Sequence, residues 1–575
     1  MICKPNVWSE DSFGGFLDNV NTEEDIVTGS HRHNHLIENK KALFKSINYL
    51  NSIKFSVNNT LLDYLENDGK FLLDLIKEDK DIHRTITLKI ASSFANVPFY
   101  LNTQADWRGR IYTQSFFITY QGGDLSSALL NFWEGSSLSE LGKLNLYIHG
   151  ANNHNEANIS KESFENRINW VKNNYDKIIN LDKSLILNAE KPFIFLAFCL
   201  NIKELHNNPL AIIKTPVFLD ATCSGIQHLS ALLLDLELGI KVNLSPYNQE
   251  HVPNDVYSDL ISPINTAINK YGEENPTFAN LSLIELNRKI IKTSIMTKVY
   301  NVSQYGIAKQ IESKLESKEY DTSTIEKISS DLSSSLKENK RLNLYFAPGK
   351  ENTSILLNKS DIFKIAEIIN NQIFVIFPSL NNIYSYFIET AKIMVDLGIP
   401  ITWITPSGLK ITQHYLKSKQ TVISTKLFKQ TKKMVIRESL NETDKLKQSN
   451  AIIPNIIHSL DATHLINLIN NAQDQSFTPI ITVHDCFGTH PNKMDELAFK
   501  VRKEFILLYS QNNFLATYHN RLIQSIKDNN YKVIFNEEEK SNYVINNYRA
   551  IKIPNVPKLG ELDLKKIIDS KYMIS

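Results

Sequence analysis

The amino-acid sequence predicts an α/β (α+β) fold that is mostly helical and contains a small sheet carrying two aspartates. The segments TPVFLDA (215–221) and PIITVHDCF (479–487) are short, apolar and rich in β-branched residues, and each has an aspartate at its exit, a pattern typical of buried strands. Residues 41–95 instead repeat apolar positions at helical spacing, with a break at Asp68-Gly69. With 575 residues, the chain exceeds one hydrophobic core and is expected to form roughly two to four subdomains.

The composition is that of a globular chain without a global charge signal. Hydrophobic residues make up 42%, charged residues 22%, and the formal net charge is +1, so a nucleic-acid surface would have to come from local basic clusters. The four cysteines lie far apart, which predicts neither a zinc site nor a disulfide framework. No apolar run approaches the ~20 residues that span a bilayer, and the first residues resemble no targeting peptide, so we expect no membrane partner.

Asp220 and Asp485 are the candidate catalytic and metal-binding residues. Burying an ionised carboxylate costs roughly several kcal/mol unless a positive partner compensates it, and Mg²⁺ is such a partner. Two carboxylates from different strands can hold two Mg²⁺ ions about 4 Å apart, one at an attacking hydroxyl and one at a leaving phosphate. The sequence therefore predicts two-metal phosphoryl transfer, although a lone aspartate at a strand end more often only begins a turn or caps a helix.

The residues around each aspartate favour a ligand site. Asp220 is followed by ATCSGIQHLSALL, whose small side chains leave room for a nucleotide sugar before a helix begins near Gln227. Around Asp485, the string HDCFGTHP places polar residues and a glycine at a turn instead of ordinary aliphatic core residues. Both segments therefore have the composition of an active site.

Two further segments are expected to be helical. In NRKIIKTSIMTKVYNVSQYG (287–306), Arg288, Lys292, Met296 and Tyr300 recur every four residues, so their side chains share one broad helix face. Arg and Lys match phosphates and the Tyr ring can pack on a sugar or base, which suits a nucleoside triphosphate; a solvated basic face with a core tyrosine is the alternative. Residues 311–345 mix both charge signs and are expected to form solvated helices on a peripheral lobe.

Five motifs give the chain a family resemblance: DWRGR (106–110), LDATCSGIQHLSA (219–231), RKIIKTSIMTKVYNVSQYG (288–306), PNIIHSLDATHL (454–465) and HDCFGTH (484–490). In this order they resemble the single-subunit RNA polymerases of bacteriophages and mitochondria, above all those of linear plasmids in fungal mitochondria. The resemblance covers essentially the whole chain. It implies a right-hand polymerase fold with palm, fingers and a reduced thumb, in which a small antiparallel palm sheet carries the aspartates.

The resemblance also implies domain boundaries. The expected parts are a remnant of the N-terminal region (1–45), a reduced thumb (46–96), the first part of the palm (97–248), fingers (249–457) with a segment like a specificity hairpin (420–450), and the second part of the palm with the C-terminal segment (458–575). The last residues, LGELDLKKIIDSKYMIS, resemble a segment that folds back toward the active site in the family.

Each motif residue receives an implied role. Asp220 and Asp485 correspond to the catalytic aspartates that hold two Mg²⁺ ions, with the Ala221 carbonyl as a further ligand. The substrate-binding residues are implied to be Arg288, Lys292 (also catalytic), Tyr300, Lys161, and His458, which helps to choose ribose. The nucleic-acid-binding residues are implied to be Arg108 and Arg110 near the template and hybrid, His484 beside the second metal, and Lys429, Lys432 and Lys433 at the hairpin tip.

The implied reaction is DNA-templated RNA synthesis in the mitochondrion, with a DNA template, nascent RNA and ribonucleoside triphosphates as partners. Small residues at 221–225 leave no bulky gate against ribose, which disfavours a related DNA polymerase. The first recognisable residues correspond to a point inside a full-length family member. Either the chain is a truncated copy, in the extreme a non-catalytic nucleic-acid-binding relic, or a separate promoter-recognition factor supplies promoter handling.

One departure concerns the residue after Tyr300, where family members commonly have glycine. The chain has Asn301 there. Because asparagine tolerates left-handed backbone angles better than most residues, the hinge is expected to survive.

Overall fold

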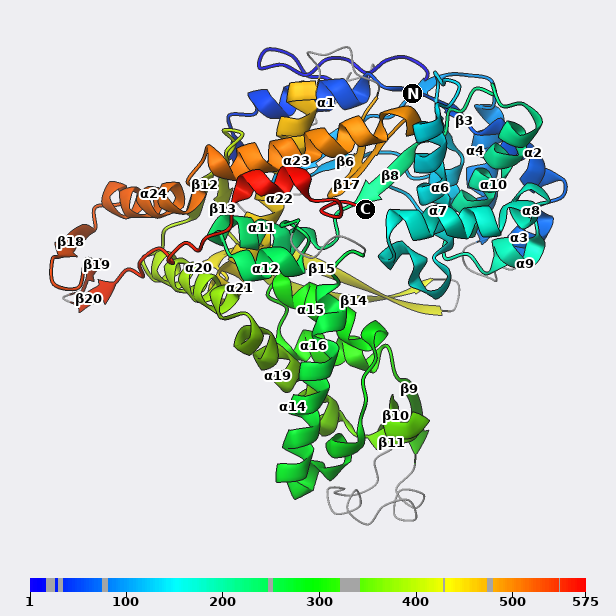
Figure 1. Cartoon of the computed structure of the whole chain (residues 1–575). Helices are drawn as coiled ribbons and strands as arrows, with labels where there is room; N and C mark the ends of the chain where they lie inside the picture. The colour runs from blue at the N-terminus through cyan, green and yellow to red at the C-terminus, as the bar shows by residue number, and fades with distance from the viewer. Residues whose placement is uncertain are drawn as a thin grey trace. The chain divides into compact units, whose positions relative to one another are not determined.

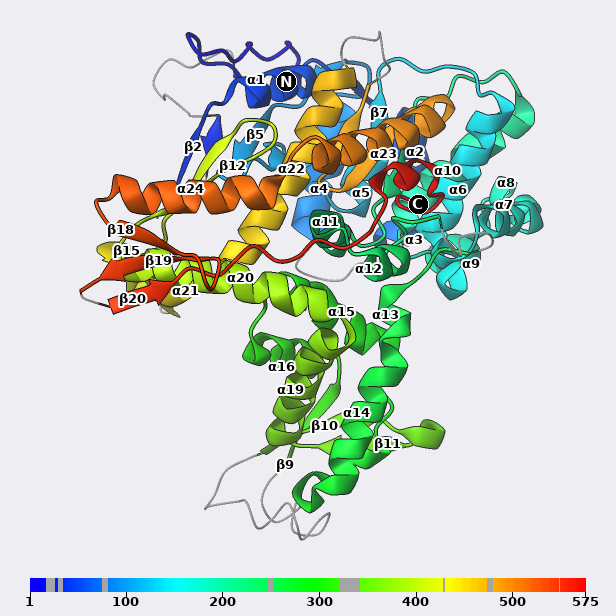
Figure 2. The ribbon, with the colours of Figure 1, turned by 60° about the vertical axis from the view of Figure 1, so that its left-hand side comes forward.

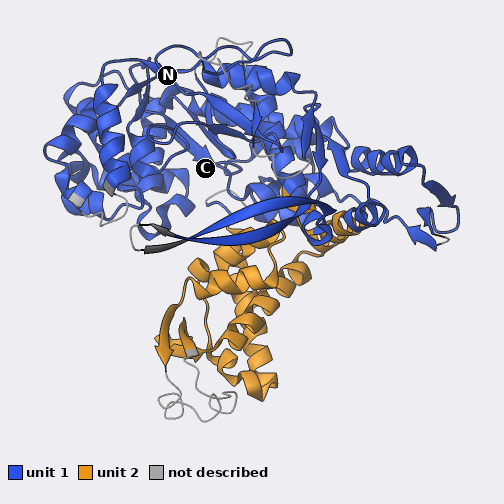
Figure 3. Ribbon diagram, turned by 180° about the vertical axis from the view of Figure 1, so that it is seen from behind, with its two compact units in different colours: residues 1–254, 390–449, 455–575 blue, residues 255–389, 450–454 orange. Residues whose placement is uncertain are grey.

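The computed structural model describes residues 1–16, 26–28, 35–74, 81–246, 252–320, 342–427, 430–472, 479–547 and 549–575. The chain divides into two compact units (Figure 3). Unit 1 comprises residues 1–254, 390–449 and 455–575, and unit 2 comprises residues 255–389 and 450–454. Within the ranges described, no helix combines the length and the apolar character that crossing a membrane requires.

The sheet that carries both candidate aspartates lies in unit 1 and is antiparallel. Strand β17 (Cys486–Thr489) lies between β16 (Ile481–Val483) and β8 (Val217–Asp220). Cys486 pairs with Asp220 and Val483 pairs with Cys486. The two predicted strands are thus confirmed as parts of one sheet, but 479–487 is a hairpin and not a single strand, because the polar pair His484-Asp485 turns the chain.

Apolar residues of this sheet and the surrounding helices form the core of unit 1. Val217, Ile481 and Phe487 are buried, and α6 (Glu140–His154) and α23 (Met494–Ser510) contact β8 (Figure 1). Helix α11 (Ser224–Leu233) follows β8 and is buried along its whole length. Helix α22 (Ile452–Ala472) is apolar on most sides, as expected of a helix surrounded by protein.

The predicted helical region 41–95 is confirmed, with one strand inserted. It contains α1 (Lys41–Asn51), β3 (Lys54–Val57), α2 (Asn59–Glu66), α3 (Lys70–Asp74) and α4 (Asp81–Ser93). The break at Asp68-Gly69 falls between α2 and α3, as predicted. The Asn58 side chain accepts a hydrogen bond from the Leu61 amide, which satisfies a free N–H at the start of α2.

The remaining described elements of unit 1 surround this core. Helix α24 leads into the sheet of β18, β19 and β20 at an edge of the unit (Figure 2). The bounds are β1 Val27–Thr28, β2 Leu36–Glu38, β4 Phe99–Tyr100, β5 Thr103–Asp106, β6 Ile111–Thr113, α5 Asp124–Ala128, β7 Leu130–Phe132, η1 Glu156–Lys161, α7 Phe164–Asn173, α8 Tyr175–Ile179, α9 Lys183–Leu187, α10 Pro192–Asn207, α12 Leu236–Lys241, β12 Ile401–Ile404, β13 Lys410–Gln413, η5 Pro491–Lys493, α24 Phe514–Asp528, β18 Lys532–Asn536, β19 Ser541–Asn546, β20 Arg549–Lys552 and η6 Leu564–Asp569.

A long β-hairpin occupies most of the segment 420–450. Strand β14 (Leu416–Leu427) pairs with β15 (Gln430–Thr443), and α21 (Lys445–Asn450) follows. The structure therefore has a hairpin where the sequence predicted one. Of the lysines predicted at its tip, Lys433 is exposed, whereas Lys429 and the side chain of Lys432 lie outside the described residues.

Unit 2 lies inside the segment predicted as fingers, and that name stays a prediction. Its helices and strands are α13 Val256–Asp259, α14 Ile261–Glu274, η2 Pro276–Leu283, α15 Arg288–Val299, α16 Gln304–Glu312, β9 Glu316–Tyr320, β10 Leu342–Pro348, η3 Lys350–Asn352, β11 Ser354–Leu357, α19 Lys359–Ile376 and the first part of α20 Pro378–Asp396. Helix α15 confirms the helix predicted within 287–306.

The expectation of helices over 311–345 is wrong for the described residues of that segment that follow Glu312. After α16 ends at Glu312, β9 and β10 pair antiparallel, with Leu344 opposite Lys318. Leu344 and Tyr345 are buried. The mixed charges of β9 do not show the alternating pattern of a strand. Its extended conformation depends instead on pairing with β10, whose apolar residues supply the buried face.

Candidate active site

Asp220 and Asp485 lie on adjoining ends of the central sheet. Asp220 is the last residue of β8, and the Ala221 amide donates a hydrogen bond to the Asp485 carbonyl at 3.2 Å. Asp485 is the second residue of the two-residue turn between β16 and β17. Asp220 is exposed and Asp485 is half-buried. The sheet thus brings together two carboxylates that are 265 positions apart in the sequence (485 − 220).

The electrostatics at this pair suit a cation. Burial raises the pKa of Asp485, and the negative charges of Asp220 and Asp461 raise it further. Within the described part of the chain, no group of three or more His, Cys, Asp or Glu residues is placed to hold a metal ion. Mg²⁺ usually binds proteins through one or two carboxylates and completes its shell with water and substrate phosphates. The pair of aspartates therefore fits magnesium that binds together with a nucleotide.

His484 precedes Asp485 in the same turn and has a left-handed backbone, with φ of 59°. Positive φ is common in two-residue hairpin turns, and histidine adopts it more often than most other residues that carry a side chain. Its ring packs edge-on against Tyr112, with 4.8 Å between centroids, and burial lowers its pKa. The predicted roles of His484, beside the second metal and in binding nucleic acid, stay predictions.

The C-terminal residues extend the sheet next to Asp220. The Ser575 amide donates to the Asp220 carbonyl at 2.9 Å, the Thr222 amide donates to the Met573 carbonyl at 3.3 Å, and Ala221 forms a β-bridge with Ile574. Figure 1 shows the C-terminus beside β8. The predicted return of this segment toward the aspartates is therefore confirmed.

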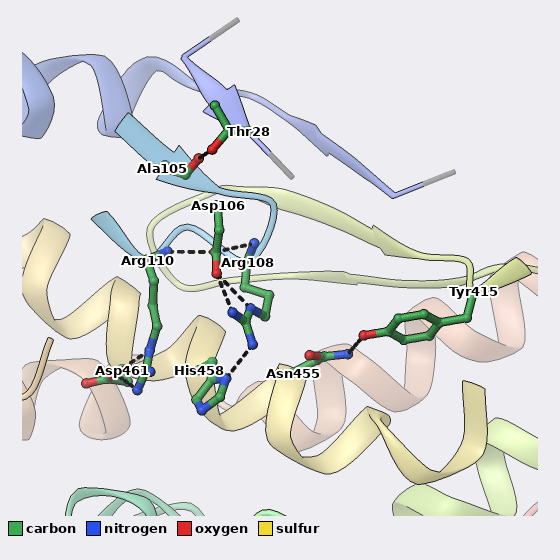
Figure 4. Close-up of polar contacts among 9 residues, drawn as sticks. All are labelled: Thr28, Ala105, Asp106, Arg108, Arg110, Tyr415, Asn455, His458 and Asp461. Carbon is green, nitrogen blue, oxygen red and sulfur yellow. Dashed lines mark hydrogen bonds and ion pairs between the residues drawn. The ribbon is translucent and has the colours of Figure 1, made fainter. Parts of the chain in front are cut away.

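The DWRGR motif forms a tight turn between β5 and β6. The Asp106 side chain accepts hydrogen bonds from the backbone amides of Arg108 at 2.8 Å and Arg110 at 3.2 Å. Gly109 has a backbone φ of +92°, a conformation that residues with a Cβ rarely adopt. The turn directs both arginines toward α22 (Figure 4).

We expect Gly109→Ala to disrupt this turn. The new Cβ would lie 3.2 Å from Cδ1 of Leu409, and the positive φ adds strain, so unfolding should become easier by about 1–3 kcal/mol. Differential scanning fluorimetry would record the lower melting temperature. Gly123→Ala is the matched control, because Gly123 has φ of −69° and open space around it; equal effects of the two substitutions would contradict the expectation.

Arg110 forms a buried ion pair with Asp461 on α22. Nε and Nη2 of Arg110 donate to Oδ2 of Asp461 at 3.0 and 2.6 Å, and the side chains are only 14% and 3% exposed. Burial alone would raise the pKa of Asp461, but Arg110 and the nearby histidines His228 and His458 hold it below its ordinary value. This ion pair links the DWRGR turn to helix α22.

Arg108 reaches His458, one helical turn before Asp461. Its Nη1 lies 2.7 Å from Nδ1 of His458, and its Nε and Nη2 both donate to Oδ2 of Asp106. His458 is half-buried, and burial together with Arg110 and Arg108 lowers its pKa to about 2. The ring is therefore neutral at physiological pH.

The residues implied to bind the triphosphate lie in unit 2. Arg288 begins α15, its Nε donates to Oδ2 of Asp255 at 2.7 Å, and Nζ of Lys292 lies 5.7 Å from the centroid of the Tyr257 ring. Tyr300 directly follows Val299, the last residue of α15, and is the C-cap of the helix. Asn301 has φ of 58°, which confirms the left-handed backbone expected at this position.

Sequence reasoning missed the partners that hold the arginines. Asp461 follows His458 by three residues on α22, so a helix prediction for this motif would have placed both side chains on one face. Asp106 precedes Arg108 by two residues, but its hydrogen bonds depend on the turn geometry, which the sequence does not state. Lys161 ends η1 in unit 1, and its phosphate contact stays a prediction.

Comparison with known proteins identifies the family of the chain. The family model of DNA-dependent RNA polymerase matches residues 136–575. A probable DNA-directed RNA polymerase of Gelasinospora sp. (strain G114) is 44% identical over all of this chain and 68% of its own length, and one of Neurospora crassa is 30% identical over 90% of this chain and 61% of its own.

A mitochondrial DNA-directed RNA polymerase of Schizosaccharomyces pombe is 30% identical over 85% of this chain and 41% of its own length. The chain therefore spans from about two fifths to about two thirds of the length of these relatives. The family model covers more than half of the chain, including both aspartates and the helix with His458. The chain belongs to the family of single-subunit DNA-dependent RNA polymerases of the bacteriophage and mitochondrial type.

Proposed function

We propose that the chain synthesises RNA on a DNA template. In this reaction the 3′-oxygen of the RNA forms a bond to the α-phosphorus of a ribonucleoside triphosphate, and the bond from that phosphorus to the pyrophosphate oxygen breaks. The observation that carries the proposal is the pair Asp220 and Asp485 on adjoining strand ends, where burial, and then the charge of Asp220, raises the pKa of Asp485. Family membership supports the same reaction.

Asp220 and Asp485, with the backbone carbonyl of Ala221, would hold two Mg²⁺ ions. When bound, these ions lower the pKa of the attacking hydroxyl and neutralise the phosphate charge. The aspartates themselves fix the position of the reacting groups, which converts a bimolecular step into one with a preset geometry. Small residues after Asp220 leave the ribose hydroxyl unobstructed.

Arg288, Lys292, Tyr300 and Lys161 are proposed to bind the incoming nucleotide. Nη2 of Arg288 is buried and has no hydrogen-bond partner within the described ranges, and a phosphate oxygen would satisfy it. Lys292 adds a second cation on the same helix face, near Tyr257.

We expect Lys292→Ala to lower kcat/KM for ribonucleotides about 10–100-fold, because a hydrogen bond to a charged group is lost. Steady-state nucleotide addition measures this. Lys289→Ala is the matched control, since Lys289 is exposed on the same helix and should leave kcat/KM unchanged. A similar loss for both variants would indicate a general charge effect and contradict a specific role of Lys292.

DNA template, nascent RNA and a promoter are the proposed macromolecular partners, with the hairpin of β14 and β15 and its exposed Lys433 as a candidate DNA contact. Arg108, Arg110 and His484 are proposed to lie near the hybrid. We also propose a mitochondrial location, because the relative from Schizosaccharomyces pombe is named as mitochondrial. A separate promoter-recognition factor is proposed as a further partner.

Primer extension on an assembled RNA/DNA scaffold tests the proposal. With Mg²⁺, the RNA primer should be extended only by the ribonucleotide complementary to the template base, and changing that base should change the nucleotide used. Extension that uses deoxyribonucleotides equally well would favour a DNA polymerase. No extension by a folded chain would favour a non-catalytic nucleic-acid-binding relic.

A further inference from the structure

Unit 1 contains a cavity of about 230 Å³ next to the strand end that carries Asp220. Its apolar walls include Ile148 of α6, Phe164 of α7, Leu219 of β8 and Ile574 of the C-terminal segment. Successive side chains of a strand point to opposite faces of the sheet, so Leu219 faces the cavity while Asp220 faces away from it. The cavity is therefore distinct from the proposed metal site.

Two cationic side chains, Arg502 of α23 and Lys571, also line this cavity. Arg502 is half-buried, and its Nε is buried without a hydrogen-bond partner among the residues that the structure describes. Asp495 lies on the same helix, but its Oδ2 accepts a hydrogen bond from Nδ2 of Asn145 at 2.6 Å. Burial lowers the pKa of Arg502, and the charges of Asp495 and Asp569 offset this only in part. The positive charge at the cavity is thus incompletely compensated.

A third cation packs on the aromatic wall of the cavity. Cζ of Arg167 lies 4.9 Å from the centroid of the Phe164 ring. Arg167 is fully buried, and its Nε and Nη1 donate to uncharged oxygens, the Glu162 carbonyl and Oδ1 of Asn152. Its Nη2 has no hydrogen-bond partner within the described ranges, and burial lowers its pKa to about 10. Because buried charges are normally paired, an anion in the cavity would stabilise this side of unit 1.

We propose that the cavity binds a small organic anion that combines a carboxylate or phosphate group with a compact apolar body. The guanidinium of Arg502 matches two oxygens of such a group, and Lys571 adds a point charge. The apolar body would pack against Phe164 and the aliphatic walls. Since a dry cavity of about 150 Å³ holds benzene, this cavity has room for an aromatic ring that carries a charged group.

A bound anion would act on the position of Asp220. Leu219 directly precedes Asp220, and Ile574 forms a β-bridge with Ala221, while the Ser575 amide donates to the Asp220 carbonyl at 2.9 Å. A ligand that contacts both walls favours the arrangement in which these two segments are paired. The site is thus an activating regulatory site for nucleotide addition, and only this step rests on the proposed function.

Binding can be measured on the full chain without nucleic acid, by isothermal titration calorimetry with benzoate, phenyl phosphate and benzamide. The first two carry a ring and a negative charge, whereas benzamide is the uncharged counterpart of benzoate. We expect the better anion to bind with a Kd of about 1 mM or tighter, and benzamide to bind at least about tenfold more weakly. The better anion identifies the head group. Equal binding of benzamide, or no binding of either anion, would overturn the proposal.

Variants locate the anion in the cavity. Arg502→Gln should weaken binding of the better anion about tenfold or more, because a hydrogen bond between charged groups is lost. Lys503→Gln is the matched control, since Lys503 is the exposed neighbour on the same helix. Ala498→Leu narrows the cavity at another lining residue and keeps both cations, so it should also weaken binding, and it serves alone if Arg502→Gln fails to fold. Undiminished affinity in either folded variant would overturn the assigned site.

The effect on catalysis is a separate measurement. A saturating concentration of the better anion should raise kcat/KM for single-nucleotide addition about fivefold in the native chain and in Lys503→Gln, but not in Arg502→Gln. An anion that binds and leaves kcat/KM unchanged would overturn the regulatory role. If the native chain adds no nucleotide at all, the proposed function fails, whereas calorimetry still decides whether the cavity binds the anion.

Discussion

Asp485→Asn should abolish nucleotide addition and at the same time stabilise the fold in the absence of magnesium. Activity should fall on the order of a thousandfold or more, because the variant removes a carboxylate proposed to hold the metal ions at the reacting phosphate. Stability should rise because the carboxylate carries a pKa raised by burial, Asp220 and Asp461. Its ionisation opposes folding at pH values above its unfolded pKa, and the neutral amide avoids this cost.

The measurement pairs single-nucleotide addition on an RNA/DNA scaffold with melting temperature in metal-free buffer. We expect the melting temperature of Asp485→Asn to rise by roughly 1–3 °C. Asp11→Asn, at an exposed carboxylate, serves as the control and should change neither property. Loss of activity together with a lowered melting temperature would point to a structural role of Asp485 and contradict the account.

Arg110→Met should destabilise the protein by about 3 kcal/mol, because it leaves Asp461 as an uncompensated buried charge. The Asp461 side chain is only 3% exposed and takes both of its close charged hydrogen bonds from Arg110. The melting temperature should fall by about 5 °C or more. The loss should be smaller at low pH, where protonation of Asp461 removes the unpaired charge.

The double variant Arg110→Met/Asp461→Leu separates charge from packing. If the unpaired carboxylate causes the loss, replacing it with an apolar residue should recover most of the stability, as hydrophobic replacements of buried ion pairs often do. If the double variant is as unstable as Arg110→Met alone, the arginine acts mainly through packing, and the electrostatic explanation is wrong.

Much of the active-site sheet could be predicted from sequence because its strands are short, apolar and end at polar residues. The apolar segments before Asp220 and around Asp485 are interpreted as buried strands. Antiparallel pairing of these strands then places the two aspartates together. A turn was expected within HDCFGTHP, but the two-residue hairpin at His484-Asp485 was not predicted. Its left-handed histidine lacks the Asn-Gly or Gly signal that marks such turns.

Other features depend on partners that are far away in the sequence. Strand β9 has exposed, mixed-charge residues and becomes a strand only by pairing with β10. The arginines of DWRGR were assigned to nucleic acid by resemblance, but their contacts with Asp106, His458 and Asp461 follow from a turn that depends on Gly109. The local sequence pattern therefore predicts secondary-structure elements and the positions of motifs. The hydrogen-bond partners of a side chain can be identified only in the folded structure.

The central claim is that Asp220 and Asp485 together hold the metal ions for nucleotidyl transfer, and binding of Mn²⁺ as a paramagnetic stand-in for Mg²⁺ tests it most directly. Free Mn²⁺ would be measured by electron paramagnetic resonance while the chain is titrated in the presence of a scaffold and a non-reactive ribonucleoside triphosphate analogue. The account predicts tight binding of two ions by the native chain, and loss of that binding in both Asp220→Asn and Asp485→Asn. Equal Mn²⁺ binding by the native chain and both folded variants would contradict it.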